Sequence, residues 1–268
     1  MSLLAVLWNA NPEIFEVFGV SVRWYSLFFA LAFLGGYYLV QFYSKEAKLA
    51  PKVFDYWLLY MIIGSIIGAR LGHCLFYEFN YYSQHPVEIF QTWKGGLASH
   101  GGAIGLLIAL WLFSLHFKLS YIWILDRISA ATALGGVLIR LGNLMNSEIF
   151  GYPTDLPWGF VFLRADTDKV PRHPTQLYEA ISYLIVFIIL HFTDRKYKYN
   201  PPKGLLVSIL ITGIFGTRFF IEFLKERQVD FENYMPLDMG QWLSIPFVFG
   251  GIAYLIYLYR RKNKILNK

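Results

Sequence analysis

Seven long runs of apolar residues restrict the fold of this chain more than any other feature of its sequence. They cover residues 22–42, 53–76, 97–116, 121–140, 177–192, 204–223 and 239–259. A helix needs about 20 residues to cross the hydrocarbon core of a bilayer, and most of these runs have that length. With 56% hydrophobic and only 16% charged residues, the chain does not resemble a soluble domain. We therefore predict an all-α, polytopic integral membrane protein with about seven transmembrane helices.

Basic residues gather in every second connection between these runs. Thirteen of the 24 Lys and Arg residues lie in the segments 43–52, 117–120 and 193–203 and in the tail after residue 259. Because cytoplasmic loops are enriched in Lys and Arg, the N-terminus is predicted to lie outside the cell and the C-terminus in the cytoplasm. Membrane orientation, rather than nucleic-acid binding, accounts for the net charge of +6. We predict one transmembrane domain over 1–268, whose longest extracytoplasmic loop covers about 141–176.

Polar side chains stand at one end of most of the predicted helices. They are Arg23, Tyr25, Arg70, His100, Arg140, Asn143, Asn146, Glu148, His173, Gln176, Tyr178, Glu179, Arg218, Glu222, Asp238 and Gln241. With alternating helices and an external N-terminus, all of them fall on the extracytoplasmic side. Ionisable groups inside membranes usually line a site or a pathway, so this pattern predicts a site that opens to the outer leaflet.

Each of these residues also has a purely structural interpretation. Arg218 and Glu222 are spaced i,i+4 and can form a simple ion pair on a helix. Asn143 and Asn146 can bond neighbouring helices. A lone His100 is more often structural than functional, but the two glycines that follow it allow a ligand or another backbone to approach closely.

The chemistry of the predicted site favours an anionic lipid. Arginine binds phosphate oxygens in a bidentate way that lysine does not match, and lysines are almost absent from this face. A histidine beside the arginines can take a proton near neutral pH. The single cysteine, Cys74, provides neither an internal disulfide nor a cysteine zinc site. The residues alone thus predict a site for a lipid phosphate with an acid–base group, without selecting a reaction.

Several motifs, in order along the chain, resemble those of the prolipoprotein diacylglyceryl transferase family. The motifs are VRWY at 22–25, HGGAIG at 100–105, RLGNLMNSEIFG at 140–151, RHPTQLYE at 172–179, TRFFIE at 217–222 and MGQ at 239–241. The stretch 140–151 is the most specific of them. The departures are small: Ser26 follows the RWY motif and Ser99 precedes the histidine.

The resemblance implies a reaction and its partners. Members of the family are multi-pass proteins of the bacterial inner membrane, with seven helices and an external N-terminus. They move the sn-1,2-diacylglyceryl group of phosphatidylglycerol onto the lipobox cysteine thiol of a prolipoprotein, which gives a thioether and releases glycerol phosphate. The implied partners are phosphatidylglycerol, prolipoprotein signal peptides with a lipobox cysteine, and membrane lipids, but no nucleic acid. No metal or organic cofactor is implied.

The resemblance also implies roles for individual residues. The catalytic residues would be His100 as the candidate base, with Arg140 and Arg218 holding the phosphate. The substrate-binding residues would be Tyr25, Arg70, Asn143, Asn146, Glu148, Gly151, His173 and Glu222.

Three other functions share part of this pattern. Another lipid-modifying transferase would use the same arginines but release a different product. A transporter or flippase for an anionic lipid would place polar residues at mid-depth and at both ends of its helices. A non-catalytic assembly protein would use the arginines only to anchor lipid.

Overall fold

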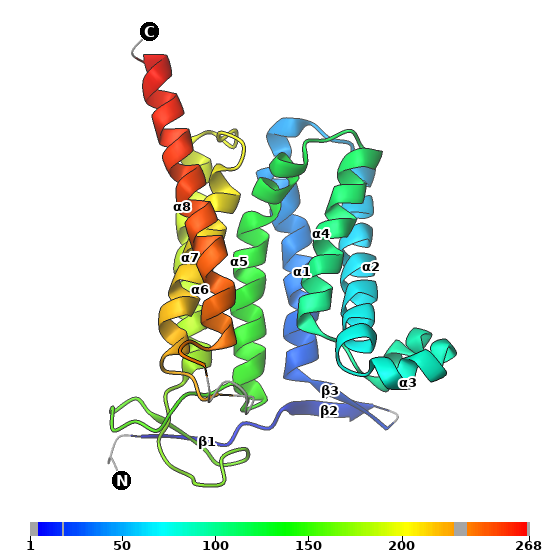
Figure 1. Ribbon diagram of the computed structural model, residues 1–268, viewed down its shortest axis with the longest axis vertical. Helices are drawn as coiled ribbons and strands as arrows, with labels where there is room; N and C mark the ends of the chain where they lie inside the picture. The colour runs from blue at the N-terminus through cyan, green and yellow to red at the C-terminus, as the bar shows by residue number, and fades with distance from the viewer. Residues whose placement is uncertain (1–4, 18, 228–234, 267–268) are drawn as a thin grey trace. The chain divides into compact units, whose positions relative to one another are not determined.

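The computed structural model describes residues 5–17, 19–227 and 235–266, most of which are helical (Figure 1). Seven helices in these ranges are long and apolar enough to cross a membrane. They are α1 (Trp24–Tyr43), α2 (Pro51–Phe76), α4 (Ser99–His116), α5 (Tyr121–Met145), α6 (Thr175–Lys196), α7 (Leu205–Glu222) and α8 (Met239–Leu266). The prediction of an all-α polytopic protein with seven spans is therefore confirmed, while the orientation of its termini stays a prediction.

Short strands and turns connect these helices. Strand β1 (Val6–Trp8) pairs in parallel with β4 (Phe160–Phe162), and β2 (Glu13–Val17) pairs antiparallel with β3 (Val20–Arg23). The short helix α3 (Phe79–Gln84) and the 3-10 turns Pro86–Phe90 and Thr92–Lys94 follow α2, and a further 3-10 turn, Lys45–Ala47, follows α1. The sequence analysis did not predict the strands, because each is short and β1 finds its partner about 150 residues away.

Contacts along the chain divide it into two compact units. Residues 1–46 and 125–268 make up the first, which we call the large unit, and residues 47–124 make up the small unit. Each unit has its own packing and is described by itself. The prediction of a single transmembrane domain over 1–268 stays a prediction.

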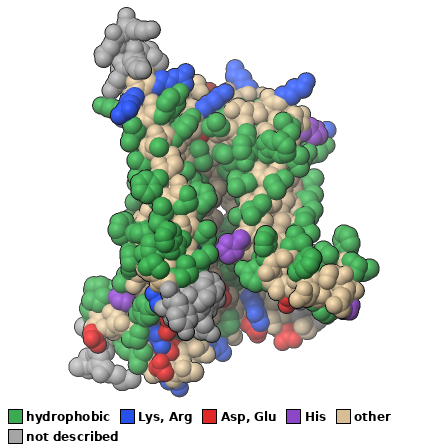
Figure 2. Space-filling model, viewed as in Figure 1, with side chains coloured by type: hydrophobic (Ala, Val, Ile, Leu, Met, Phe, Trp, Pro, Cys, Tyr) green, Lys and Arg blue, Asp and Glu red, His purple; other side chains and the backbone are tan. Residues whose placement is uncertain are grey.

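The large unit packs α6 against α7 and α7 against α8 (Figure 1). Its core is formed by the buried side chains of Tyr43, Ala130, Ala133, Val186, Leu190, Leu206 and Leu210. Large apolar side chains also cover much of the surface of the helices (Figure 2). Ile185, Phe192 and Phe249 are among the exposed ones. On a soluble protein such a surface would be a liability, whereas hydrocarbon tails solvate it in a membrane.

A buried polar cluster lies near the start of α5. Arg127 donates a hydrogen bond to Asp194 at 3.0 Å and another to the carbonyl of Tyr43, and both charged side chains are 1% exposed. Next to it, Asp126 accepts a 2.6 Å hydrogen bond from the N–H of Gly204 ahead of α7. Arg127 and Arg140 are 13 residues apart, which is about 20 Å along a helix. Buried charged residues therefore lie toward both ends of α5.

The small unit is built on a close antiparallel contact between α2 and α4. Small residues face each other along the contact: Gly64, Gly68 and Gly72 on α2 and Gly101, Gly105 and Ala109 on α4. A Cβ atom added to Gly68 would lie 2.6 Å from the Cα of Gly105, so the two backbones touch. This is the small-xxx-small packing of membrane helices. The glycine that directly follows His100 thus serves helix packing.

Candidate active site

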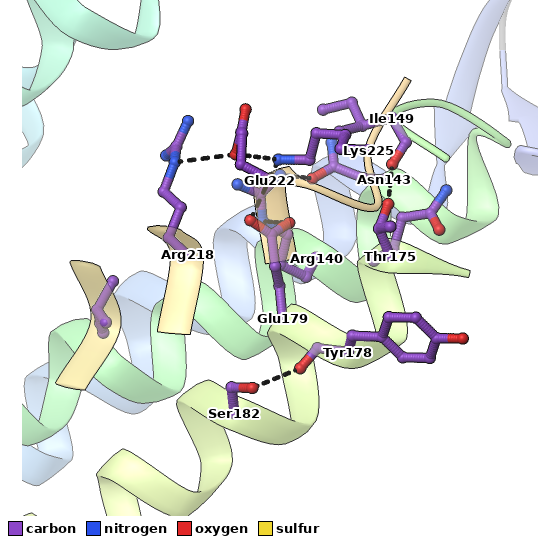
Figure 3. Close-up of polar contacts among 12 residues, drawn as sticks. Arg140, Asn143, Ile149, Thr175, Tyr178, Glu179, Ser182, Arg218, Glu222 and Lys225 are labelled. Carbon is purple, nitrogen blue, oxygen red and sulfur yellow. Dashed lines mark hydrogen bonds and ion pairs between the residues drawn. The ribbon is translucent and has the colours of Figure 1, made fainter. Parts of the chain in front are cut away.

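A chain of alternating charges lies at one end of the large unit, where α5, α6 and α7 meet (Figure 3). Arg140 Nε lies 2.9 Å from Glu179 Oε2, and the other oxygen of Glu179 lies 3.3 Å from Lys225 Nζ. Lys225 Nζ also lies 3.0 Å from Glu222 Oε2, which in turn is 3.7 Å from Arg218 Nε. The structure thus brings together Arg140, Arg218 and Glu222, which the sequence singled out as site residues, and adds Glu179 and Lys225.

These five charges differ in how far they are buried. The Glu179 and Lys225 side chains are 0% and 5% exposed, and Glu222 and Arg140 are little more exposed. Arg218 is the open end of the chain, with 34% of its side chain exposed. Burying a charge is costly unless it is paired, and here each group has an opposite partner. Three cations face two carboxylates, so the chain carries one net positive charge and suits an anion.

A second arm of polar contacts runs from Arg140 toward the loop after α5. Arg140 Nη1 donates to Asn143 Oδ1 at 3.2 Å, and Asn143 Nδ2 donates to Glu148 Oε1 at 2.7 Å. Asn146 donates to the same carboxylate oxygen at 3.2 Å. Helix α5 continues five residues beyond the predicted end of its apolar run, and this places Asn143 in its last turn. Glu148 thus reaches Arg140 only through the Asn143 amide.

Tyr25 lies beside this arm, in the first turn of α1. Its ring packs on Gly142 of α5, where an added Cβ would lie 2.9 Å from Tyr25 Cδ2. The Tyr25 hydroxyl is close enough to Glu148 and Arg140 to interact electrostatically with both. The glycine therefore lets the tyrosine approach the charged groups.

Gly151 stands where three segments of chain cross. Its N–H donates to the carbonyl of His173 at 2.9 Å, and the N–H of Tyr152 donates to the carbonyl of Leu224 at 2.9 Å. Gly151 also pairs with Lys225 in an antiparallel bridge. A Cβ at Gly151 would collide with the Leu224 carbonyl oxygen and lie 2.8 Å from His173 Cβ. Only glycine fits here, and its fit sets the backbone position of Lys225.

The start of α6 holds the loop that carries Glu148. Gln176 Nε2 donates to the Glu148 carbonyl at 2.6 Å, and Thr175 Oγ1 donates to the Ile149 carbonyl at 2.7 Å. These bonds fold the chain after α5 back over the charged groups. Gln176 was predicted from the sequence to lie at this end of the helix, but without a role.

Arg172 belongs to a separate ion cluster in the loop between α5 and α6. It contacts Asp166 at 2.7 Å, Asp168 at 3.3 Å and Glu226 at 3.1 Å. Burial alone would raise the pKa of Asp166, but the hydrogen bonds from Arg172 outweigh it and hold that pKa below its ordinary value. The hydrogen bond with Asp166 in turn raises the pKa of Arg172. All these contacts stabilise the loop.

His173 is the next residue along and makes a different set of contacts. Its Nδ1 lies 3.2 Å from the Tyr178 hydroxyl, which accepts a 3.0 Å hydrogen bond from the Trp158 indole. Burial lowers the pKa of His173, so the neutral imidazole is favoured at neutral pH. Its proposed contact with substrate stays a prediction.

Arg70 and His100 lie in the small unit. Arg70 is 3% exposed and donates to the carbonyls of Glu88, Ile89 and Gly95 at 2.6 to 2.8 Å. Its guanidinium therefore clamps the connection between α2 and α4. His100 is exposed in the first turn of α4, and it forms no hydrogen bond or ion pair with any described residue. The substrate-binding role of Arg70 and the catalytic role of His100 stay predictions.

Three buried oxygen atoms near Glu148 have no hydrogen-bond donor among the described residues. They are Asn146 Oδ1, Ser147 Oγ and Gln176 Oε1. Buried polar atoms are normally hydrogen-bonded, so these three mark a place that accepts further donors. Within the described ranges, no group of three or more His, Cys, Asp and Glu side chains is arranged to hold a metal ion.

Comparison with known proteins gives consistent matches over almost the whole chain. Residues 12–257 match the family described as prolipoprotein diacylglyceryl transferase. The chain is 46% identical over 275 residues to a phosphatidylglycerol–prolipoprotein diacylglyceryl transferase of Bacteroides fragilis, covering 98% of both chains. It is 47% identical over 248 residues to the enzyme of that name from Chloroherpeton thalassium, covering 92% of each. The match to the Tolumonas auensis enzyme is 44% over 260 residues, covering 97% of this chain and all of the relative.

Proposed function

The chain belongs to the prolipoprotein diacylglyceryl transferase family, and from this premise we propose how its charged chain carries out the transfer. The protein is a multi-pass bacterial membrane transferase that moves the diacylglyceryl group of phosphatidylglycerol to a prolipoprotein. One observation carries the proposal: Arg140 and Arg218 lie at the two ends of a single alternating chain of charges that carries a net positive charge. The transporter of an anionic lipid is not favoured.

In the proposed reaction, the acceptor is the thiol of the lipobox cysteine. Its thiolate sulfur attacks the carbon of the diacylglyceryl group that is bonded to a phosphate oxygen. A carbon–sulfur bond forms, the carbon–oxygen bond to phosphate breaks, and glycerol phosphate leaves with the bonding electrons. The thiol proton passes to a base, for which we propose His100. Cys74 is buried and takes no part.

Arg140 and Arg218 are proposed to bind the phosphate of the lipid. The phosphodiester carries one negative charge, and the departing monoester carries about −1.5 to −2 at pH 7. Cations that are already in place stabilise this developing charge without reorganisation, and they act most strongly where water is excluded. The ion pairs with Glu179 and Glu222 hold both guanidinium groups in position.

The arm around Glu148 is proposed to bind the glycerol part of the headgroup. The acceptor oxygens of Asn146, Ser147 and Gln176 offer partners for the hydroxyls of glycerol. The Asn143 amide keeps Arg140 and Glu148 apart while it bonds to both. Four further residues are proposed to support binding of the lipid through the contacts described above: Tyr25, Arg70, Gly151 and His173.

The site is proposed to face the outer leaflet of the bacterial inner membrane. The positive-inside rule puts the basic segments in the cytoplasm, which leaves the Arg140 end of α5 on the opposite side. Signal peptides with a lipobox cysteine and the surrounding membrane lipids would reach the site from that leaflet.

The test uses purified protein in detergent with phosphatidylglycerol and a lipobox peptide. We would follow glycerol phosphate release and the mass of the peptide for wild type, Arg140→Ala and the control Arg195→Ala. The Arg195 side chain is exposed in the last turn of α6, at the predicted cytoplasmic end of that helix. We expect diacylglyceryl addition with wild type and the control, and a loss of about 100-fold or more with Arg140→Ala. Folded wild-type protein that binds lipid but yields neither product would contradict the proposal.

A further inference from the structure

Lys225 is the one lysine among the buried charged residues of the described chain. It follows α7 by three residues, and its ammonium lies between the carboxylates of Glu179 and Glu222, at 3.3 and 3.0 Å. Each of those carboxylates also faces an arginine, Arg140 or Arg218. Both proposed phosphate ligands are therefore connected to each other through this lysine (Figure 3).

The charge balance explains what Lys225 adds. Without it, two carboxylates would face two arginines and the group would be neutral. With it, the two carboxylates are shared among three cations and one positive charge remains. An arginine that is less fully neutralised by its own carboxylate binds an incoming phosphate more strongly.

The backbone holds Lys225 in this place from several sides. Its N–H donates to the Glu222 carbonyl at 3.1 Å, and the residue is bridged to Gly151. The next side chain, Glu226, is fixed by Arg172 at 3.1 Å. These contacts hold the ammonium in one place where three segments of chain meet. A lysine on the surface would instead be flexible.

We propose that Lys225 is a positioning residue for the transfer: it binds Glu179 and Glu222 so that Arg140 and Arg218 keep a net positive charge for the lipid phosphate. The inference rests on the proposed function. Because the phosphate gains negative charge as glycerol phosphate leaves, the effect of Lys225 is larger on the transition state than on lipid binding. If Lys225 only stabilised the fold, its replacement would change neither the transition state nor lipid binding in the molecules that remain folded.

The test compares kcat and KM for phosphatidylglycerol in Lys225→Met, Lys225→Arg and the double variant Lys225→Met with Glu222→Gln. For Lys225→Met we expect kcat to fall by about 10-fold or more while KM changes less. Lys225→Arg keeps the charge and most of kcat. The double variant removes one carboxylate as well, which restores the net charge, so its kcat is expected to exceed that of Lys225→Met by about 3-fold or more.

Lys203→Met, at an exposed position ahead of α7, is the matched control and is expected to behave like wild type. Wild-type kcat in Lys225→Met, or a double variant no faster than the single one, would overturn the inference. If Lys225→Met does not fold, the double variant and Lys225→Arg test the inference instead. A near-wild-type kcat in Lys225→Arg, together with a loss of kcat of more than 10-fold in the double variant, would also overturn the inference. Failure of wild type to release glycerol phosphate would instead contradict the proposed function.

Discussion

Gly240 sets how closely α8 approaches Glu222. A Cβ at this position would lie 2.5 Å from both Cδ and Oε1 of the Glu222 carboxylate. We expect Gly240→Ala to push the carboxylate away from Lys225 and Arg218 and to lower kcat by about 10-fold, since small displacements in a preorganised site are costly. The measurement is glycerol phosphate release by the folded variant.

Gly250→Ala is the matched control, because it lies in the same helix and an added Cβ meets nothing within 4 Å. Equal activities for the two alanine variants would show that the space at Gly240 has no influence on the carboxylate.

His100 is the proposed base for the cysteine thiol. If it takes the proton, both kcat/KM and the dependence of kcat/KM on pH require its imidazole. His100→Gln is then expected to lower kcat/KM by about 100-fold and to change the shape of the pH profile. His116→Gln, at the other end of α4, is the control and keeps the wild-type profile. A pH profile that His100→Gln leaves unchanged would assign the proton to another group.

At the residue scale, the sequence predicted the arginines better than their partners. Arg140, Arg218 and Glu222 were singled out because the predicted topology places them at one helix end and because arginine suits phosphate, and the structure connects them through ion pairs. Lys225 was missed because a lysine three residues after an apolar run is normally solvated. Its burial depends on Gly151 bringing a distant segment against Leu224, and no local pattern reports that contact.

Among the elements, the loop between α5 and α6 depends on the ion pair of Arg172 with Asp166. The pKa of Asp166 is lower in the folded protein than in the unfolded chain, so its carboxylate stabilises the fold above about pH 4. This contribution is lost as the pH falls through the lowered pKa. We expect Asp166→Asn to reduce the melting temperature in detergent at pH 7 and to have a smaller effect at pH 3.

Asp155→Asn is the control for that comparison, since Asp155 is an exposed residue of the same loop. A loss of melting temperature by Asp166→Asn that is the same at both pH values would mean that the carboxylate charge is not what stabilises the loop.

Some helices and strands were predicted from the sequence and others were not. Apolar runs located all seven spans, because most of them have the length of a bilayer crossing and the short run 177–192 lies within the longer helix α6. Helix α5 extends five residues beyond the apolar run 121–140, because its last turn carries a polar side chain: the Asn143 amide bonds to both Arg140 and Glu148. Strands β1 and β4 escaped prediction because their pairing is non-local.

For the whole molecule, the sequence predicted seven spans but not the second polar cluster. The buried pair of Arg127 and Asp194 lies at the end of the large unit where the basic connections were expected. The two terminal nitrogens of Arg127 bond to Asp194 and to the carbonyls of Tyr43 and Tyr199, so the pair connects α1, α5 and α6. Charged residues at both ends of a bundle therefore do not by themselves indicate a transport pathway.

The orientation of the whole molecule is predicted from its charge distribution and can be tested directly. Cys74 is buried and 2% exposed, so it gives little background with a thiol reagent that does not cross membranes. We expect Asp155→Cys, in the loop before α6, to be labelled in intact spheroplasts of an expressing strain. Lys198→Cys, after α6, is expected to be labelled only once the membrane is permeabilised. Both positions are exposed, so a difference between them reports the side of the membrane and not accessibility.

The reverse labelling pattern would place the Arg140 end of α5 in the cytoplasm. The arginines would then face the inner leaflet, whereas a secreted prolipoprotein presents its cysteine at the outer one. Because the positive-inside rule counts basic residues in short loops, removing basic residues from one loop should also change the orientation. Replacing Arg195, Lys196, Lys198 and Lys203 by Gln is expected to produce a fraction of molecules with reversed labelling at residue 155. An unchanged pattern in that variant would show that other basic segments determine the orientation.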